Sequence, residues 1–107
     1  METTRNTVIN IIHRHYTDAF GDPVPHQLNR CSAWYSGKYY NIDEDVHYQV
    51  LQSYNTPVAL YVYETNTVYR LGTWSNTTAQ HQHKFKRMLN ADTMVDLGGQ
   101  GLYRGWR

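Results

Sequence analysis

The first part of the chain has a hydrophobic pattern of helical period. From Thr4 onward, apolar and aromatic side chains recur three or four positions apart, with polar residues such as Arg14 between them. This spacing predicts an amphipathic helix from about Thr4 to Phe20. Gly21 offers a left-handed C-terminal cap, and the prolines after it cannot continue a helix, so we expect the helix to stop there.

Between Trp34 and Leu71 the pattern changes to β-branched and aromatic residues with period-two stretches, which are typical of strands. The segment Trp34–Tyr40 is either a strand or a hairpin whose tip contains Gly37. In Val58–Tyr63, alternate residues are expected to face inward. A short turn then leads into Val68–Leu71, which favours an antiparallel hairpin. A further strand is predicted at 47–54, after an acidic turn at 43–45.

A helix start signal follows these strands. Thr77, with Gln80 three positions on, matches a capping box and predicts Thr77 as the N-cap. The helix should run from about Thr78 to Leu89 and end near 90–92. Its predicted apolar face consists of His81, Phe85, Met88 and Leu89.

These elements predict an α+β fold in which an N-terminal and a C-terminal helix pack against a small antiparallel sheet of three to five strands. The chain of 107 residues has the length of a single domain, taken as residues 1–107. The glycine-rich tail, residues 96–107, is expected either to be flexible or to dock on a partner.

Composition narrows the classes of function. The 14% aromatic content includes ten Tyr residues, which favours a recognition surface, and so many aromatics in a small domain predict a homo-oligomer, with a dimer favoured. A net charge of +1 argues against a strongly electrostatic nucleic-acid binder. The single Cys31 excludes an intramolecular disulfide and fits a reducing cytoplasm, while the absence of a long apolar run argues against membrane insertion.

No catalytic, cofactor or metal site is expected from the sequence motifs. His81 with His83, and His13 with His15, are close pairs, but residues two apart on a helix point away from each other and cannot chelate one ion. No nucleophile elbow, P-loop or dinucleotide fingerprint is present. These observations favour binding over catalysis.

The best ligand-site candidate lies around the start of the second helix. Backbone N–H groups at a helix start, reinforced by threonine hydroxyls, can bind a phosphate, and neighbouring aromatic rings can stack on a base. The competing interpretation is that Thr77 only caps its own helix. The predicted ligand-binding residues are Tyr54, Asn55, Thr56, Trp74, Thr77, Thr78, His81 and Lys84.

A basic helix face provides an alternative site. His83, Lys86 and Arg87 project opposite the apolar face and, with exposed tyrosines, could contact a nucleic acid or a host protein. A run of charged residues of this kind most often forms a solvated helix face.

Two segments of the chain resemble a known family. The run S-Y-N-T-P-V-A from Ser53 to Ala59, and W-S-N-T-T from Trp74 followed by His81, Lys84 and Phe85, resemble small bacteriophage accessory proteins of largely unassigned function. Many members have Tyr where this chain has Trp74, and the resemblance does not extend to residues 1–45. It implies a phage product in the host bacterial cytoplasm.

With the aromatic content, this resemblance favours a non-catalytic counter-defence protein that binds and sequesters a nucleotide-like host signal. The alternative is a macromolecular binder that contacts a host defence protein or nucleic acid.

Overall fold

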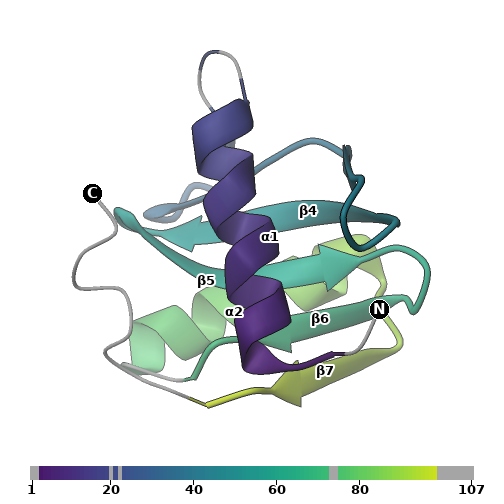
Figure 1. Cartoon of the computed structure of the whole chain (residues 1–107). Coiled ribbons are helices and arrows are strands. Elements are labelled where there is room, and N and C mark those ends of the chain that lie inside the picture. The colour runs from purple at the N-terminus through teal and green to yellow at the C-terminus, as the bar shows by residue number, and fades with distance from the viewer. Residues whose placement is uncertain (1–2, 20, 22, 73–74, 99–107) are drawn as a thin grey trace.

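The computed structural model describes residues 3–19, 21, 23–72 and 75–98. Within these ranges, two helices cover opposite faces of one sheet of seven strands (Figure 1). The predicted α+β class is confirmed, but the sheet has more strands than the three to five expected. The elements are α1 (Arg5–Asp18), β1 (His26–Gln27), β2 (Ala33–Tyr35), β3 (Tyr39–Asn41), β4 (Val46–Ser53), β5 (Thr56–Val62), β6 (Thr67–Arg70), α2 (Asn76–Leu89) and β7 (Thr93–Asp96).

The sheet is mixed rather than purely antiparallel, which corrects the sequence prediction. Its strand order is β1-β2-β4-β5-β6-β7, and β3 also pairs with β4. All of these pairs are antiparallel except β6 with β7. A parallel pair needs a long crossover, and α2 provides it between β6 and β7. The predicted β5–β6 hairpin is present.

The segment 34–40 forms two short strands on the same partner, so the hairpin alternative is wrong. Trp34 pairs with Gln52 and Tyr39 with Tyr48, which places β2 and β3 in line along β4. Ser36 fills the interruption: its backbone N–H donates to the Val50 carbonyl at 2.9 Å, and its hydroxyl accepts from the Val50 N–H at 2.8 Å. The serine side chain thus replaces a backbone acceptor.

Both faces of the sheet are buried, because each is covered by a helix. On one face Ile11 and Ile12 of α1 pack with Leu60. On the other face Phe85 of α2 is fully buried with Leu51, Ala59, Tyr61 and Val68. The predicted alternation holds from Ala59 onward, with Leu60 and Val62 in the α1 core and Ala59 and Tyr61 in the α2 core. It fails at Val58, which lies in the α2 core with Ala59, because the pairing of β4 with β5 shifts register there.

Helix boundaries differ from the predictions in detail. The C-cap of α1 is Ala19, with extended backbone, so the helix ends before Gly21, whose φ is +76°; Phe20 lies outside the described residues. The N-cap of α2 is Ser75 rather than Thr77, because the Ser75 hydroxyl accepts from the Thr78 N–H. The predicted end of α2 is confirmed by Asn90, a left-handed C-cap.

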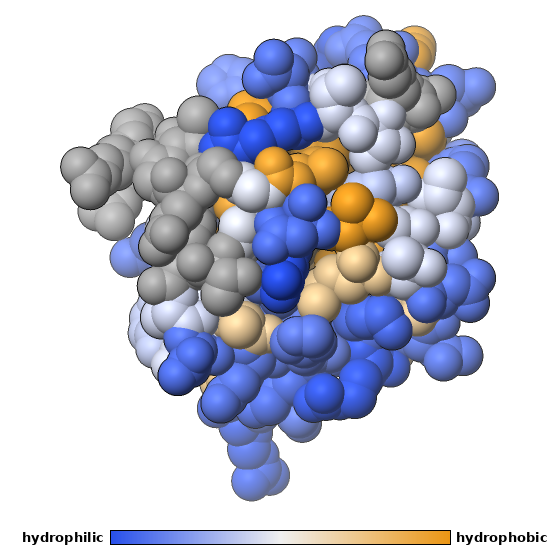
Figure 2. Space-filling view, turned by 90° about the horizontal axis from the view of Figure 1, so that it is seen from below, coloured by the Kyte–Doolittle hydropathy of each residue, from blue (hydrophilic) through white to orange (hydrophobic). Residues whose placement is uncertain are grey.

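The described part of the predicted tail belongs to the fold. After β7, the Leu97 N–H donates to the Arg70 carbonyl and Arg5 Nε donates to the Gly98 carbonyl. Residues 99–107, the remainder of that tail, lie outside the described residues. Figure 2 looks onto the β7 edge and shows a small apolar area among mostly hydrophilic atoms; Val95 of β7 is 37% exposed. In the described part of the chain, neither helix could cross a bilayer.

Candidate functional site

A basic hollow lies where the β1–β2 turn meets the C-terminal half of α2. Its volume is about 340 Å³, within the range that holds small ligands. We call it the basic hollow and define it by its lining residues, which are Gln27, Leu28, Asn29, Tyr35, Lys84, Arg87 and Met88.

The wall formed by the β1–β2 turn is fixed by local hydrogen bonds. Asn29 and Arg30 both have left-handed backbone, with φ of +48° and +61°, and this reverses the chain tightly. The Cys31 N–H donates to the Leu28 carbonyl at 2.9 Å, and the Gln27 side-chain amide donates to the Cys31 carbonyl at 3.0 Å. Leu28 is buried, so the turn is anchored in the core beneath the hollow.

The helical wall carries two cations one turn apart. Lys84 and Arg87 are three positions apart on α2, which places them on neighbouring positions of one helix face. Lys84 Nζ lies 3.8 Å from Cys31 Sγ, so its ammonium contacts the residue that follows the left-handed turn. The Tyr35 ring forms a side wall and is backed by Phe85, with ring centroids 6.2 Å apart.

The charge of this hollow is uncompensated. Among the described residues, neither Lys84 nor Arg87 forms an ion pair with a carboxylate. No Asp or Glu lines the hollow. The positive charge of the hollow also acts on His81. Burial is the larger cause that lowers the pKa of this imidazole, and the Coulombic effect of Lys84 is the smaller one.

Two other hollows differ because carboxylates line them beside their cations. In one, Arg14 pairs with Asp18 at 2.7 Å and also with Asp43. In the other, which His83 and Lys86 also line, Arg70 pairs with Asp96 at 3.1 Å. Of these three hollows, the basic hollow is therefore the one prepared for an anion.

The predicted anion site at the start of α2 is not assembled as expected. Thr77 is exposed and is not the cap, while the Thr78 N–H is already taken by the Ser75 hydroxyl. Thr78 itself is buried, with its hydroxyl 3.5 Å from Ser53 Oγ. Trp74, the proposed aromatic wall, lies outside the described residues.

The structure does bring some of the predicted residues together. Tyr54 and His81 lie side by side, with ring centroids 5.9 Å apart, and Tyr54 is 54% exposed. Tyr54 has left-handed backbone, φ +54°, in the two-residue turn with Asn55, which is unusual for a bulky side chain. Asn55 is exposed and Thr56 half-buried beside it, whereas Lys84 belongs to the basic hollow.

A hydrogen-bonded serine–histidine pair was not anticipated from the sequence. Ser53 Oγ lies 2.8 Å from His81 Nδ1, a distance that would suit an activated nucleophile. Both side chains are only 3% exposed, so a substrate does not reach them in this structure. The contact ties α2 to β4.

The alternative macromolecular site is divided between two hollows. His83 and Lys86 line the hollow that contains Asp92 and Asp96, whereas Arg87 lines the basic hollow. Gln27, Asn29, Tyr35 and Met88 of the basic hollow are not among the binding residues that the sequence predicts. The helical spacing predicts Met88 on the apolar face of α2, yet it is 43% exposed.

Within the described ranges, no group of three or more metal-ligating side chains comes together.

Neither the curated proteins nor the solved structures contain a significant match to this chain. The model of a family of unknown function, DUF8033, matches residues 24–99. This match includes both walls of the basic hollow and leaves α1 outside it. The chain belongs to the DUF8033 family, whose function is unknown.

Proposed function

We propose that this chain is a non-catalytic binding protein that holds a small phosphate-bearing, nucleotide-like ligand in the basic hollow. The observation that carries the proposal is the pair Lys84 and Arg87, two cations in a hollow without a lining carboxylate. Charge-assisted hydrogen bonds from such groups to phosphate oxygens are among the stronger polar contacts in proteins. This site includes Lys84, which the sequence predicts as a ligand-binding residue. It places the phosphate in the basic hollow instead of at the start of α2.

The other walls suit the remainder of a nucleotide. The Tyr35 ring, whose centroid lies 5.2 Å from that of His26 and 6.2 Å from that of Phe85, adds an aromatic contact, and Met88 adds an adaptable apolar one. Asn29 supplies an exposed amide at the rim for polar groups of the ligand. A volume of about 340 Å³ accommodates a mononucleotide-sized ligand rather than a polymer.

Calorimetric titration with ADP, adenosine and inorganic phosphate tests the proposal. We expect ADP to bind, adenosine to bind much more weakly, and the affinity for ADP to fall as salt is added. Lys84→Met should weaken ADP binding about tenfold or more, because a charge-assisted hydrogen bond contributes about 1.5–3 kcal/mol. Arg87→Met should act in the same direction.

Lys86→Met is the matched control, since Lys86 lies on the same helix but lines the hollow that contains Asp92 and Asp96. It should leave ADP affinity nearly unchanged. The proposal fails if neither ADP nor phosphate binds at millimolar concentration, or if Lys86→Met weakens binding as much as Lys84→Met. An effect concentrated on His83, Lys86 and Arg87 would instead favour the macromolecular alternative.

The resemblance to phage accessory proteins extends this proposal to counter-defence. A protein that binds a nucleotide signal without converting it lowers the free concentration of that signal. After incubation with the protein and denaturation, a bound nucleotide should be recovered chemically intact by chromatography. Recovery of a converted product would contradict sequestration and indicate catalysis.

A further inference from the structure

A second hollow lies on the opposite face of the sheet, between the C-terminal half of α1 and strands β3 and β4. We call it the aromatic hollow; its walls include Arg14, His15, Tyr39, Asn41 and Tyr48. Its volume is about 240 Å³, and an enclosed space of about 150 Å³ can already hold a benzene ring. The hollow therefore suits a single ring with a substituent.

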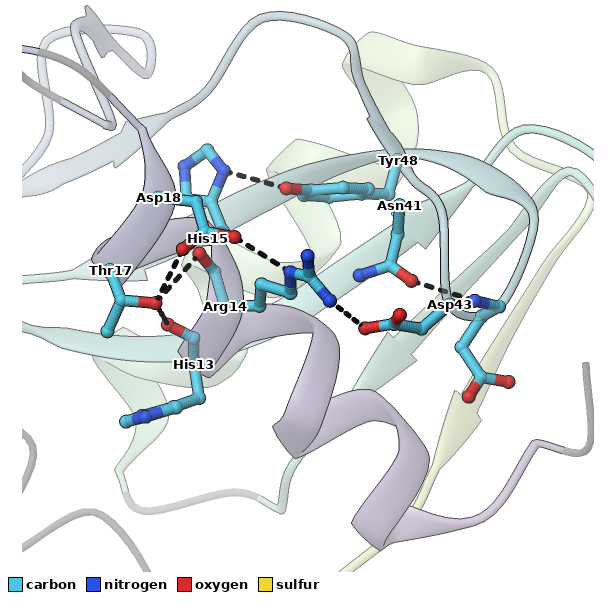
Figure 3. A network of polar contacts seen from close by, with 9 residues as sticks. His13, Arg14, His15, Thr17, Asp18, Asn41, Asp43 and Tyr48 are labelled. Atoms are coloured by element: carbon cyan, nitrogen blue, oxygen red, sulfur yellow. Dashed lines mark hydrogen bonds and ion pairs between the residues drawn. The ribbon is translucent and has the colours of Figure 1, made fainter.

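The histidine of this hollow is neutral. His15 Nε2 lies 2.6 Å from the Pro23 carbonyl, which can only accept, so Nε2 carries the proton. Nδ1 then accepts from the Tyr48 hydroxyl at 2.9 Å (Figure 3). Burial lowers the pKa of His15 and raises the pKa of Tyr48 to about 12, so both stay uncharged near neutral pH.

The charged side chains in and beside the hollow oppose an anionic ligand: Arg14 and Asp18 line it, and Asp43 pairs with Arg14. Figure 3 shows the Arg14 guanidinium between the carboxylates of Asp18 and Asp43, to which it is paired. One cation between two carboxylates leaves a formal charge of −1 for the group. A neutral ligand is therefore favoured over an anion such as the phosphate expected in the basic hollow.

Asn41 places a free donor in this hollow. Its side chain is only 5% exposed, and its Oδ1 accepts from the Glu44 N–H at 2.8 Å. Among the described residues, nothing accepts from its amide nitrogen, which in Figure 3 points toward Arg14 on the side of Tyr48. Among the described residues, the fully buried side-chain polar atom without a partner is Gln82 Oε1, so the Asn41 amide nitrogen keeps contact with solvent in the hollow. It can therefore donate to a carbonyl oxygen of a ligand that enters there.

Aromatic side chains supply the walls. The Tyr39 ring is 37% exposed, and its centroid lies 4.8 Å from that of His15 and 6.2 Å from that of Tyr48. A planar ligand ring can therefore stack or meet edge-on with rings that are already held in place.

We propose that the aromatic hollow is a second ligand site, which takes a neutral planar ring whose carbonyl oxygen accepts from the Asn41 side-chain amide. This site lies on the α1 face of the sheet and does not depend on the function proposed for the basic hollow.

Titration with 2-pyridone, a neutral ring that carries a carbonyl, tests the site by NMR of the full chain. We expect saturable shifts of the Asn41 side-chain amide signals, and weaker effects from benzoate, the anionic probe. Asn41→Asp keeps the oxygen that accepts from Glu44 but removes the donor, and should weaken 2-pyridone binding about tenfold or more.

Asn66→Asp is the matched control, because its Oδ1 accepts from the Tyr61 hydroxyl in the β5–β6 turn, away from this hollow. It should bind 2-pyridone like the wild type. If Asn41→Asp does not fold, Tyr39→Leu replaces it and should also weaken binding through loss of the wall. The proposal is overturned if 2-pyridone gives no saturable shift at tens of millimolar, if benzoate binds more tightly, or if the folded variant binds as well as the wild type.

Discussion

On each face of the sheet, a buried histidine joins a helix to β4. His15 of α1 bonds to the Tyr48 hydroxyl at 2.9 Å, and His81 of α2 bonds to the Ser53 hydroxyl at 2.8 Å. The surroundings differ: near α1 the cation Arg14 is neutralised by two carboxylates, whereas near α2 Lys84 and Arg87 have no such partner among the described residues. Similar anchoring on the two faces thus leaves different chemistry at the surface.

The largest expected effect concerns the apolar packing of the two helices. On α2 the apolar core contact is concentrated in Phe85, whereas on α1 it is shared by Val8, Ile11 and Ile12. Phe85→Ala should lower the free energy of unfolding by about 3–5 kcal/mol, and Ile11→Val by about 0.5–1.5 kcal/mol. Urea unfolding measures both; a loss at Ile11 as large as that at Phe85 would contradict this order.

The second prediction concerns how the two buried histidines make the stability of the fold depend on pH. The pKa values of His15 and His81 are both lowered from about 6.5, mainly by burial, so the unfolded chain binds more protons than the folded chain below pH 6.5. Stability should therefore be fully present above about pH 7 and fall as the pH drops, with a slope of at most about 1.4 kcal/mol per pH unit for each histidine.

His15→Phe removes one of these two titrations, and urea unfolding at several pH values measures the remaining slope. The variant should be less stable than wild type at pH 7.5, because the Tyr48 hydroxyl loses its partner, and the difference should shrink toward pH 5.5. His13→Gln, a change at an exposed position, is the control. A difference between wild type and His15→Phe that stays constant with pH would exclude the proposed linkage.

The third prediction concerns the helix caps. Thr4 caps α1 by accepting from the Thr7 N–H, and Ser75 caps α2 by accepting from the Thr78 N–H. Replacing either cap with Ala should cost about 1 kcal/mol in thermal or chemical unfolding. Thr77→Ala should change stability by less than about 0.5 kcal/mol, since Thr77 is exposed and outside the cap. A larger loss of stability for Thr77→Ala than for Ser75→Ala would support Thr77 as the N-cap, as the sequence predicts.

The smallest expected effect is at the exposed Arg14 ion pairs. Asp43→Asn removes one carboxylate and should shift the melting temperature less than the loss of either helix cap, because solvent screens such pairs. Its consequence should appear in ligand preference: benzoate should bind the aromatic hollow more tightly in this variant than in the wild type. An unchanged benzoate affinity would show that Asp43 does not control the charge of that hollow.

The elements with strong local signals were predictable. The spacing of apolar residues placed both helices, and the alternation in 58–63 with the following turn placed the β5–β6 hairpin. Two features of the sheet could not be predicted from the local sequence. The pairing of β7 with β6 depends on a contact made across α2, and the in-line arrangement of β2 and β3 depends on the Ser36 hydroxyl replacing a backbone acceptor.

The candidate site was only partly predictable for a similar reason. Lys84 and Arg87 have the helical spacing of one face, which the sequence shows. The sequence does not show that the β1–β2 turn, with Asn29 in a left-handed conformation, folds against that face. The Ser75 cap was missed because Thr77 with Gln80 also fits the capping-box pattern, and local sequence does not decide between overlapping caps.

Because β7 pairs in parallel with β6, it can join the sheet only after α2 has crossed the sheet face between them. During synthesis, α1 and the strands through β6 therefore leave the ribosome before the residues that cover Leu51, Ala59 and Val68. In that interval one side of a nascent sheet is uncovered and prone to aggregate. The delay before Phe85 arrives is thus the period in which the chain would benefit most from a chaperone.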